Sequence, residues 1–406
     1  MRYLVLIGDG MSDLPLPELK NRTPLELART PNMDFLARNG LCGWVSNAPK
    51  PLKPGSDVAA MSIFGYDPKK FYSGRGPLEA ASLGVKMGKR DIAFRCNLVT
   101  VRDGKMASFT SDHITTAEAD KIIKMLNSNV GAGGIKFVTG LSYRHLMIVT
   151  PKAGALAGDL ERTKCVPPHD ITGKSIESNL PSGPGEKLLK LLMKGSIMPL
   201  LEHPVNIERI KRGKSPATMI WLWGQGKRPR LKPFNKKFGK KAAVITAVHL
   251  LKGLGRMLGM EVINVRGATG FLDTNYKGKI NAALKALKSK DVVFVHVEAP
   301  DECGHMGDVK GKVRAIEDFD KFIVGGALRG IGRSGDQGIR ILVLPDHPTP
   351  IKLMTHTSDP VPFVIYDSSK DLGKGTIKGF NERELKKAKL HVKEGCELIG
   401  KLLFKR

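Results

Sequence analysis

The chain has 406 residues, 41% of them hydrophobic, and a formal net charge of +27 at pH 7. A chain of this length and hydrophobic content can bury a substantial core in two or three domains, which excludes an intrinsically disordered protein. No apolar run is long enough to span a bilayer, and the five dispersed cysteines lack any CxxC pairing, so the composition predicts a cytoplasmic protein with reduced thiols.

The first apolar run, Tyr3–Ile7, predicts a buried strand that stops at Gly8-Asp9-Gly10. In open parallel α/β sheets, ligands bind at the carboxyl ends of the strands. Asp9 is therefore a candidate ligand, although an aspartate before a glycine can also be a simple turn residue. Next along the chain, Thr30-Pro31 predicts a helix start and Gly40 the end of that helix.

Ser56, in the segment KPGSDVAAMS, is predicted to stand at the start of a helix. A coordinated cation and the positive end of a helix both lower the pKa of a hydroxyl, and the helix end also attracts phosphate. Ser56 is therefore a candidate nucleophile. The alternative is a plain helix N-cap, which is the commonest role of serine at such a position.

The middle of the chain, residues 90–235, has a different pattern. Its strands are separated by turn signals, and a helix at 116–127 opens with a capping box formed by Thr115 and Glu118. Candidate metal ligands occur only before and after this block. We therefore predict an inserted α+β cap domain at 90–235 and a discontinuous catalytic domain made of 1–89 and 236–406.

The last two fifths alternate between strand and helix patterns. Strands are predicted at 242–246, 261–265, 291–297, 339–344 and 361–366, and helices at 247–258, 276–289, 311–330 and 382–403. This alternation is typical of an α/β protein whose mostly parallel sheet is covered by helices on both faces.

Five metal-ligand side chains follow these strands. Asp301 and His305 come after the strand at 291–297, Asp346 and His347 come after the strand at 339–344, and His356 follows in THTSDP. Carboxylate and imidazole ligands together suit Mn, Zn, Co or Fe, and the number of ligands predicts two metals. Taken singly, Asp301 could cap a helix with His305 facing it, but the whole set would require several coincidences.

The charge of +27 creates a positive field that attracts anions, either phosphorylated metabolites or nucleic acid. Local basic runs occur at 227–241 and 386–393, and few aromatic residues are interleaved with them, which disfavours a single-strand binder. A solvated basic surface is the simplest interpretation, and a nucleic-acid-binding protein on this fold stays an open alternative.

The chain resembles the archaeal type of 2,3-bisphosphoglycerate-independent phosphoglycerate mutase, in the alkaline phosphatase superfamily, along nearly its full length. The segments that carry the resemblance include LIGDGMSD, KPGSDVAAMSIFGYDP, YSGRGPLEAASLGV, HVEAPDECGHMGD, LPDHPTP and THTSDPVP. The resemblance implies an alkaline-phosphatase-like, doubly wound and mostly parallel sheet with an inserted cap domain. It also implies interconversion of 3-phosphoglycerate and 2-phosphoglycerate in glycolysis and gluconeogenesis, without 2,3-bisphosphoglycerate.

The same resemblance implies two divalent metal ions, with manganese as the first expectation and Co, Zn or Mg as alternatives. Carried over position by position, one metal is held by Asp9, Ser56, Asp346 and His347, and the other by Asp301, His305 and His356. Ser56 is then the phosphoryl acceptor, which would form a phosphoserine intermediate.

Substrate residues are assigned by position alone: His113 and Lys252 as further catalytic groups, and Arg75, Arg144, Arg228 and Arg230 as substrate-binding groups. His113 could equally be a loop hydrogen-bonding residue, and Lys252 could be solvated surface. The expected substrate is a small phosphorylated three-carbon acid.

Thr218 and His249 stand where the family pattern has Asn and Asp, so a metal-dependent phosphatase or a phosphonopyruvate-type hydrolase stays an alternative. The sequence leaves the oligomeric state open.

Overall fold

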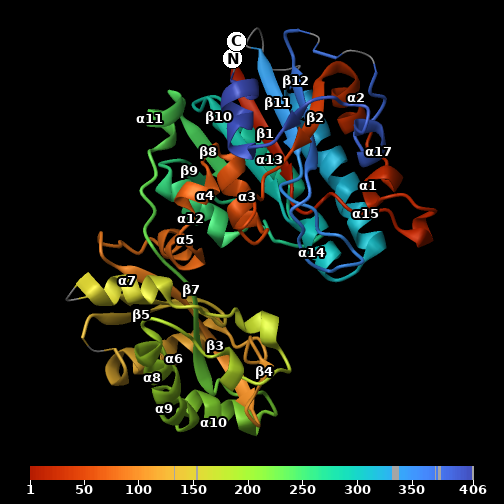
Figure 1. Cartoon of the computed structure of the whole chain (residues 1–406). Coiled ribbons are helices and arrows are strands. Elements are labelled where there is room, and N and C mark those ends of the chain that lie inside the picture. The colour runs from red at the N-terminus through yellow and green to blue at the C-terminus, as the bar shows by residue number, and fades with distance from the viewer. Residues whose placement is uncertain (132, 152–153, 332–337, 371, 374–375, 405–406) are drawn as a thin grey trace. The chain divides into compact units, whose positions relative to one another are not determined.

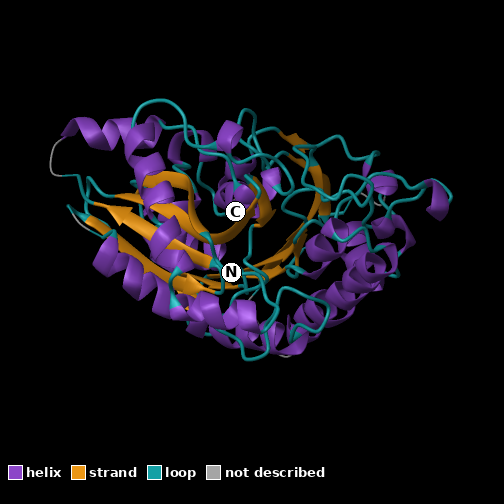
Figure 2. Cartoon of the chain, turned by 90° about the horizontal axis from the view of Figure 1, so that it is seen from below, coloured by secondary structure: helices purple, strands orange, loops and turns teal. Residues whose placement is uncertain are grey.

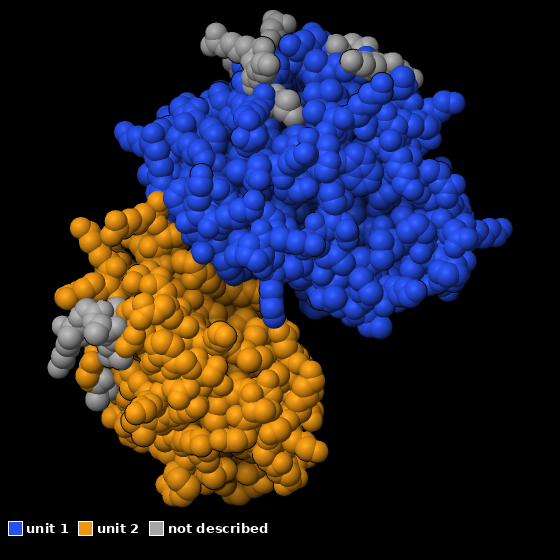
Figure 3. All heavy atoms as spheres, viewed as in Figure 1, with its two compact units in different colours: residues 1–72, 231–406 blue, residues 73–230 orange. Residues whose placement is uncertain are grey.

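The computed structural model describes all residues except 132, 152–153, 332–337, 371, 374–375 and 405–406 (Figure 1). The chain divides into two compact units, residues 1–72 with 231–406 (unit 1) and residues 73–230 (unit 2), coloured separately in Figure 3. Both units combine helices and strands (Figure 2). Among the described residues, no helix has the length and hydropathy needed to cross a bilayer.

Unit 1 contains the segments that were predicted to alternate. Its strands are β1 (Arg2–Gly8), β2 (Leu41–Val45), β8 (Ala242–Ile245), β9 (Glu261–Ile263), β10 (Val292–Val297), β11 (Ile339–Leu344), β12 (Val361–Asp367) and β13 (His391–Val392). Its α-helices are α1 (Pro24–Leu27), α2 (Pro31–Asn39), α3 (Ser56–Ile63), α4 (Pro68–Phe71), α11 (Phe234–Phe238), α12 (His249–Met257), α13 (Tyr276–Ala286), α14 (Ala299–His305), α15 (Val309–Asp318), α16 (Gly325–Ile331) and α17 (Glu382–Leu385).

The strands of unit 1 form one sheet in the order β13-β2-β12-β11-β1-β10-β8-β9. The neighbours β11, β1, β10, β8 and β9 are all parallel, whereas β12 runs antiparallel to both β11 and β2. The prediction of a mostly parallel α/β sheet is therefore confirmed.

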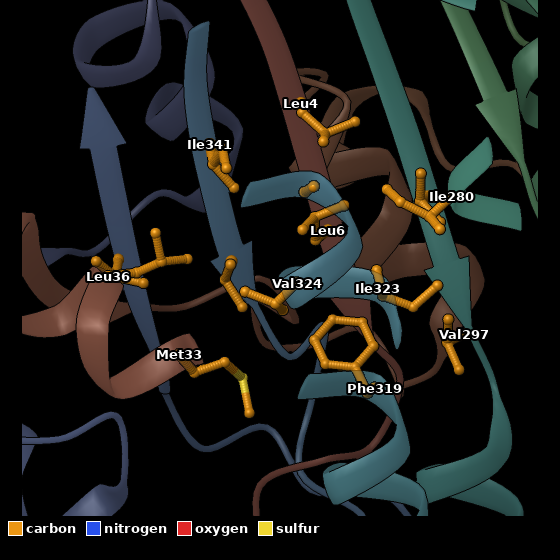
Figure 4. Packing of buried hydrophobic residues seen from close by; sticks show 14 of the residues in the cluster. Leu4, Leu6, Met33, Leu36, Ile280, Val297, Phe319, Ile323, Val324 and Ile341 are labelled. Atoms are coloured by element: carbon orange, nitrogen blue, oxygen red, sulfur yellow. The ribbon is translucent and has the colours of Figure 1, made fainter. Parts of the chain in front are cut away.

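Helices cover both faces of this sheet. On one face, Leu4 and Leu6 of β1 pack into a cluster with Met33 of α2, Ile280 of α13 and Phe319, which Figure 4 shows from close by. Alternate strand residues point to the other face because the side-chain period of a strand is two. There the Phe294 ring of β10 lies 4.6 Å from the Phe64 ring after α3 and 5.9 Å from the Phe234 ring of α11.

Most predicted elements of unit 1 are confirmed within a few residues. The helix predicted from Thr30-Pro31 to Gly40 is α2, and the capping residue after it is Gly40. The single helix predicted at 311–330 is instead three consecutive pieces, α15, a π-helix at Phe319–Val324 and α16.

The predicted closing helix at 382–403 is wrong. Only α17 is α-helical, and it is followed by the two-residue strand β13, a 3₁₀ turn at Gly395–Glu397 and a π-helix at Ile399–Leu403. Pairing of β13 with β2 replaces the helix, since His391 and Val392 lie in register with Trp44 and Val45. Local helix propensity is a weak preference that such tertiary pairing overrides.

Unit 2 is built on an antiparallel sheet. Its strands are β3 (Ile92–Arg102), β4 (Lys105–Ser108), β5 (Ile135–Leu141), β6 (Arg144–Val149) and β7 (Met219–Lys227), in the order β4-β3-β6-β5 with β7 also paired to β3. Its helices are α5 (Arg75–Ser82), α6 (Thr116–Asn129), α7 (Gly154–Arg162), α8 (Glu186–Gly195), α9 (Ile197–Leu201) and α10 (Pro204–Lys211). The predicted capping box of Thr115 and Glu118 opens α6.

The boundaries of the compact units lie at 72/73 and 230/231, whereas the sequence placed its domain boundaries at 89/90 and 235/236. The residues between the two positions of the first boundary contain the helix α5, which packs against β3 and β7. A Cβ atom on Gly76 of α5 would stand 2.3 Å from the carbonyl oxygen of Ala93 in β3. The helix thus lies against the unit 2 sheet at a distance that only glycine allows.

Candidate active site

Three neighbouring parallel strands of unit 1 end at the same level. In the register of β1, Ile7 stands opposite Leu344 of β11 and opposite His296 of β10. The residues that follow each strand end are therefore delivered to one edge of the sheet, as the parallel arrangement requires. They are Asp9 after β1, Asp346 and His347 after β11, and Asp301 and His305 in α14 after β10.

One side of this edge combines four of the predicted ligands. His347 Nε2 lies 3.4 Å from Asp346 Oδ2, 3.6 Å from Asp9 Oδ1 and 3.4 Å from Ser56 Oγ. Ser56 Oγ is also 3.4 Å from Asp9 Oδ2. The structure thus brings the candidate nucleophile into direct contact with candidate metal ligands.

The other side holds Asp301, His305 and His356. His305 Nε2 lies 3.3 Å from Asp301 Oδ2, His356 Nε2 lies 3.4 Å from Asp301 Oδ1, and the two imidazole Nε2 atoms are 2.8 Å apart. Thr349 donates its hydroxyl proton to Asp301 Oδ1. These side chains come from α14 and from the loop that links β11 to β12.

Two groups of three possible ligand atoms stand within 4.8 Å of one another: Asp301, His347 and His356 form one, and Asp9, His296 and Asp346 form the other. His347 therefore lies between the two sides of the site. Its assignment to the Asp9 side stays a prediction. His296 was not predicted.

The electrostatics of the site favour a bound cation. Burial raises the pKa of Asp9 well above its usual value, and the nearby negative charges of Asp346 and Asp301 raise it further. Burial would also raise the pKa of Asp301, but hydrogen bonds with His305 and His356 outweigh it and lower that pKa well below its usual value. The same contact with Asp301 raises the pKa of His305 to about 9.

Two carboxylate oxygens fit a metal site for a second reason. Asp9 Oδ1 and Asp346 Oδ2 are fully buried, and neither finds a hydrogen-bond partner among the described residues. A buried polar atom left without a partner costs about 1–3 kcal/mol, so such atoms mark an interaction still to be made. Carboxylate oxygens and imidazole nitrogens at this spacing are ligands that divalent metals accept, and the residues fit the divalent cations that the resemblance implies.

The loop after β1 is shaped around these ligands. Gly10 has a φ of 59°, and a Cβ atom there would stand 2.5 Å from Thr349 Oγ1 and 2.6 Å from Asp301 Oδ1. Its amide donates to Asp346 Oδ1 over 3.1 Å, and the amide of His347 donates to the same oxygen over 2.8 Å. Glycine is therefore required both by the left-handed backbone and by the space that the ligands occupy.

Ser56 is the first residue of α3, and Gly55 precedes it as the capping residue. Because Gly55 and not Ser56 occupies the N-cap position, the plain N-cap interpretation of Ser56 is wrong. The hydroxyl is half-buried and faces Asp9 and His347. The position combines a helix start with a ligand cluster, as expected for the candidate nucleophile.

A buried polar network behind Asp9 escaped sequence reasoning. Glu298 accepts a hydrogen bond from Thr246 Oγ1 over 2.9 Å and pairs with Lys279 Nζ at 2.7 Å, while His296 Nδ1 lies 3.2 Å from Glu298 Oε1. Burial would raise the pKa of Glu298, but Lys279 and His296 hold it far below its usual range. The signal that could have identified the network is a histidine and a glutamate at the end of an otherwise apolar strand pattern.

Lys252, the predicted catalytic lysine of unit 1, lies in α12 and is half-buried. Burial lowers its pKa, and the negative charge of Glu298 raises it in part. Lys252 is thus not a fully solvated surface lysine. Its catalytic role stays a prediction.

The other predicted substrate residues all belong to unit 2. The guanidinium of Arg95 lies over the Trp223 ring at 4.4 Å, and that of Arg75 lies 5.7 Å from the same ring. Burial lowers the pKa of Arg95, Glu79 opposes this, and the positive charges of Arg75 and Arg144 lower it further. Arg75, Arg95 and Arg144 therefore form a concentration of positive charge, of which sequence reasoning missed Arg95.

His113, Arg228 and Arg230 are exposed residues of unit 2. His113 ends a turn of three consecutive left-handed residues, Ser111, Asp112 and His113, whose φ angles are 47°, 52° and 48°. Such conformations are strained and occur where function or surrounding contacts hold them. The buried Arg209 supplies such contacts, because its Nη2 donates to the carbonyl oxygens of Ser111 and Asp112.

Thr218 and His249, the two residues that depart from the family pattern, lie in different units. Thr218 Oγ1 accepts a hydrogen bond from the amide of Val101 over 2.7 Å, which ties it to β3 in unit 2. His249 is the first residue of α12 in unit 1.

Comparison with known proteins places this chain in a family. The family model for 2,3-bisphosphoglycerate-independent phosphoglycerate mutase matches residues 37–206. A protein of that name from Methanosarcina mazei is 48% identical over 99% of this chain and 100% of its own length. A probable 2,3-bisphosphoglycerate-independent phosphoglycerate mutase from Geobacter sulfurreducens is 47% identical, again over 99% of this chain and 100% of its own length.

The chain belongs to this family. It is accordingly an enzyme of the isomerase class. Its fold agrees with solved structures: that of a Pyrococcus horikoshii protein has a TM-score of 0.80 at 31% identity and covers 98% of this chain and 95% of its own. The cofactor-independent phosphoglycerate mutase from Thermoplasma acidophilum has a TM-score of 0.64 at 27% identity and covers 99% and 98%.

Proposed function

We propose that the chain interconverts 3-phosphoglycerate and 2-phosphoglycerate without 2,3-bisphosphoglycerate, through a phosphoserine formed on Ser56. The observation that carries this proposal is the position of Ser56 Oγ, at the start of α3 and 3.4 Å from both Asp9 Oδ2 and His347 Nε2. The names of relatives that match the full chain at 47–48% identity support the same reaction.

The seven predicted ligands would hold two divalent cations, with Asp9, Ser56, Asp346 and His347 on one side and Asp301, His305 and His356 on the other. When bound, such cations lower the pKa of a hydroxyl and offset the negative charge of a phosphoryl group. This set of ligand atoms accepts Mn, Co, Zn or Mg. We propose manganese, which the resemblance implies, with Co, Zn or Mg as alternatives.

The chain's own residues account for the remaining steps. Ser56 Oγ, which donates to Asp9 Oδ2 over 3.4 Å, loses its proton toward that oxygen and attacks the substrate phosphorus in line. The Oγ–P bond forms as the P–O bond to glycerate breaks. Glycerate then turns and takes the phosphoryl group back on its other hydroxyl, which regenerates Ser56.

The reaction also requires groups that hold glycerate while it turns. We propose Arg75, Arg144, Arg228 and Arg230 for the carboxylate, with Arg75 and Arg144 favoured by the positive charge that they concentrate around Arg95. We propose His113 and Lys252 as the groups that exchange protons with the glycerate hydroxyls. A cytoplasmic location belongs to this proposal, and the five free cysteines are consistent with it.

Phosphorus NMR of the protein with Mn²⁺ and 3-phosphoglycerate tests the proposal. Appearance of 2-phosphoglycerate up to an equilibrium mixture is expected, and a Ser56→Ala variant should lose at least about 1,000-fold in rate because a nucleophile cannot be replaced by its neighbours. Ser62→Ala is the matched control on the same helix, since Ser62 Oγ donates to the carbonyl oxygen of Asn47 and not to a candidate metal ligand. Release of inorganic phosphate alone would favour the phosphatase alternative, and unchanged activity of Ser56→Ala would refute the phosphoserine.

A further inference from the structure

His296 is a buried imidazole next to the candidate metal ligands. It is the second-last residue of β10, opposite Ile7 of β1, and only 1% of its surface is exposed. Its Nε2 atom lies 3.3 Å from Asp9 Oδ2. It comes from a different strand than His347, so it approaches Asp9 from the other neighbour of β1.

The Nε2 atom of His296 has no hydrogen-bond partner among the described residues, even though Asp9 is close. Asp9 Oδ1 and Asp346 Oδ2 are equally buried and equally unpartnered. The same three residues form one of the two groups whose ligand atoms all lie within 4.8 Å of one another. Each residue of this group thus has one buried ligand-type atom without a partner, which indicates a cation that would bind all three residues.

The opposite nitrogen of His296 is already engaged. Nδ1 lies 3.2 Å from Glu298 Oε1, and Glu298 is fixed in turn by Lys279 Nζ at 2.7 Å and by the amide of Ala247 at 2.7 Å. A carboxylate paired with a lysine accepts hydrogen bonds and donates none, so Nδ1 carries the proton. In the tautomer that carries its proton on Nδ1, the lone pair lies on Nε2, on the side that faces Asp9.

This arrangement is the one that metal-binding histidines adopt, with one ring N–H held by a carboxylate and the other nitrogen left for the metal. We propose that His296 is a metal ligand through Nε2, on the cation held by Asp9 and Asp346. The proposal rests on the two-metal site of the proposed function. It adds a nitrogen ligand that the position-by-position assignment does not contain.

Glu298 and Lys279 act in this proposal as positioning residues. Glu298 fixes the tautomer and the ring plane of His296, and Lys279 balances the charge of Glu298 while also donating to the carbonyl oxygen of His296 over 3.0 Å. Both side chains are buried, so water does not compete for these contacts. Neither residue contacts the cation in this proposal. Removing either should therefore weaken metal binding only through its effect on His296.

A crystal structure of the full chain grown with Zn²⁺ tests the ligand assignment on the unaltered protein. The expected result is an anomalous peak about 2.1 Å from His296 Nε2, the ordinary zinc–imidazole distance. A peak bound by Asp9 and Asp346 but more than about 3 Å from Nε2 would overturn the proposal, since it would leave His296 only as a hydrogen-bond donor to Asp9. Absence of zinc at Asp9 and Asp346 would overturn it as well.

Mn²⁺ titration of variants gives a second readout that does not depend on turnover. His296→Gln should bind the Asp9-side Mn²⁺ about 10–100-fold more weakly, with a melting temperature in chelator close to that of the unaltered protein. Glu298→Gln should weaken Mn²⁺ binding to a similar degree, and it should also lower the melting temperature because Lys279 loses its buried partner. His145→Gln is the matched control, since His145 is an equally buried histidine of unit 2. Equal Mn²⁺ affinity in His296→Gln and His145→Gln would contradict the proposal.

The outcomes also separate this inference from the proposed function. A zinc–His296 bond in a protein that forms no 2-phosphoglycerate would refute the mutase and keep the ligand. Production of 2-phosphoglycerate by a protein whose cations do not bind His296 would refute the ligand assignment and keep the mutase.

Discussion

At the scale of single residues, two buried ion pairs stand behind the candidate ligands. Lys279 pairs with Glu298 and Lys312 with Asp13, each at 2.7 Å and with all four side chains buried. Such pairs add little net stability, but removal of one partner is costly. Lys312 Nζ also donates to the carbonyl oxygen of Thr349 over 2.8 Å. The pairs therefore fix the loops from which the ligands project.

The buried His145 of unit 2 predicts a pH dependence of stability. Burial lowers its pKa from 6.5 to about 4. Below pH 6.5 the imidazole therefore binds a proton in the unfolded chain, whereas in the folded chain it stays unprotonated until the pH approaches 4. Its contribution to stability is complete above pH 6.5 and is lost as the pH falls towards 4. The shift corresponds to about 3 kcal/mol, and His145→Gln should remove it.

Urea unfolding at pH 7.5 and pH 4.5 measures this effect as the change in free energy of unfolding. The unaltered protein should lose about 3 kcal/mol more than His145→Gln between the two pH values. The exposed His391 provides a control variant, His391→Gln, which should follow the unaltered protein. If His145→Gln shows the same acid loss as the unaltered protein, His145 is not the group responsible.

Sequence reasoning found the candidate ligands that stand just outside a strand or on a following loop, because an acid or histidine there breaks an apolar pattern. It missed His296, which lies inside the strand β10 and has the appearance of a core histidine. Its proximity to Asp9 depends on the register between β1 and β10, which pairs Ile7 with His296. Register between strands nearly 300 residues apart cannot be obtained from local patterns.

At the scale of secondary-structure elements, α2 receives its N-terminal cap from another helix. Asp320 Oδ1 accepts the amide of Met33 over 2.7 Å, and Asp320 Oδ2 accepts the amide of Asn32 over 3.3 Å, whereas Thr30 makes no side-chain cap bond. A carboxylate at a helix start satisfies free amides and interacts favourably with the helix dipole. Asp320→Ala should therefore cost about 2 kcal/mol of unfolding free energy.

Chemical denaturation at neutral pH measures that cost. Asp318→Ala is the matched control two residues earlier, because Asp318 makes a loose pair with Arg314 at 3.7 Å, and it should change stability by less than about 1 kcal/mol. A loss in Asp320→Ala no larger than that in Asp318→Ala would show that α2 does not depend on this cap.

Helices and strands could be predicted where their own residues contain the complete hydrophobic pattern. The strands β1, β10 and β11 are mostly apolar runs, as buried parallel strands are. The segment after α17 was not predictable, since β13 exists through its pairing with β2. Gly395 nearby is also required by packing, because a Cβ atom there would stand 2.5 Å from Asn47 Oδ1.

At the scale of the whole molecule, the chain leaves unit 1 at Tyr72 and returns to it at Leu231. The two ends of unit 2 meet within that unit, since Ser73 Oγ donates to the carbonyl oxygen of Lys227 over 2.7 Å. Unit 2 also has its own buried cluster, which includes Phe94 and Trp221. A compact segment with adjoining ends and a separate core meets the usual conditions for independent folding.

We therefore expect residues 73–230, produced alone, to fold and to unfold cooperatively in urea. The segment 90–235 that the sequence favoured is the matched comparison, and it should be markedly less stable because it lacks α5. Leu78 and Ala80 of α5 are buried, and loss of a helix that covers two strands exposes apolar surface. Circular dichroism and urea midpoints of the two segments provide the measurement. Equal midpoints would mean that α5 contributes nothing to unit 2 and that its first boundary lies nearer residue 90.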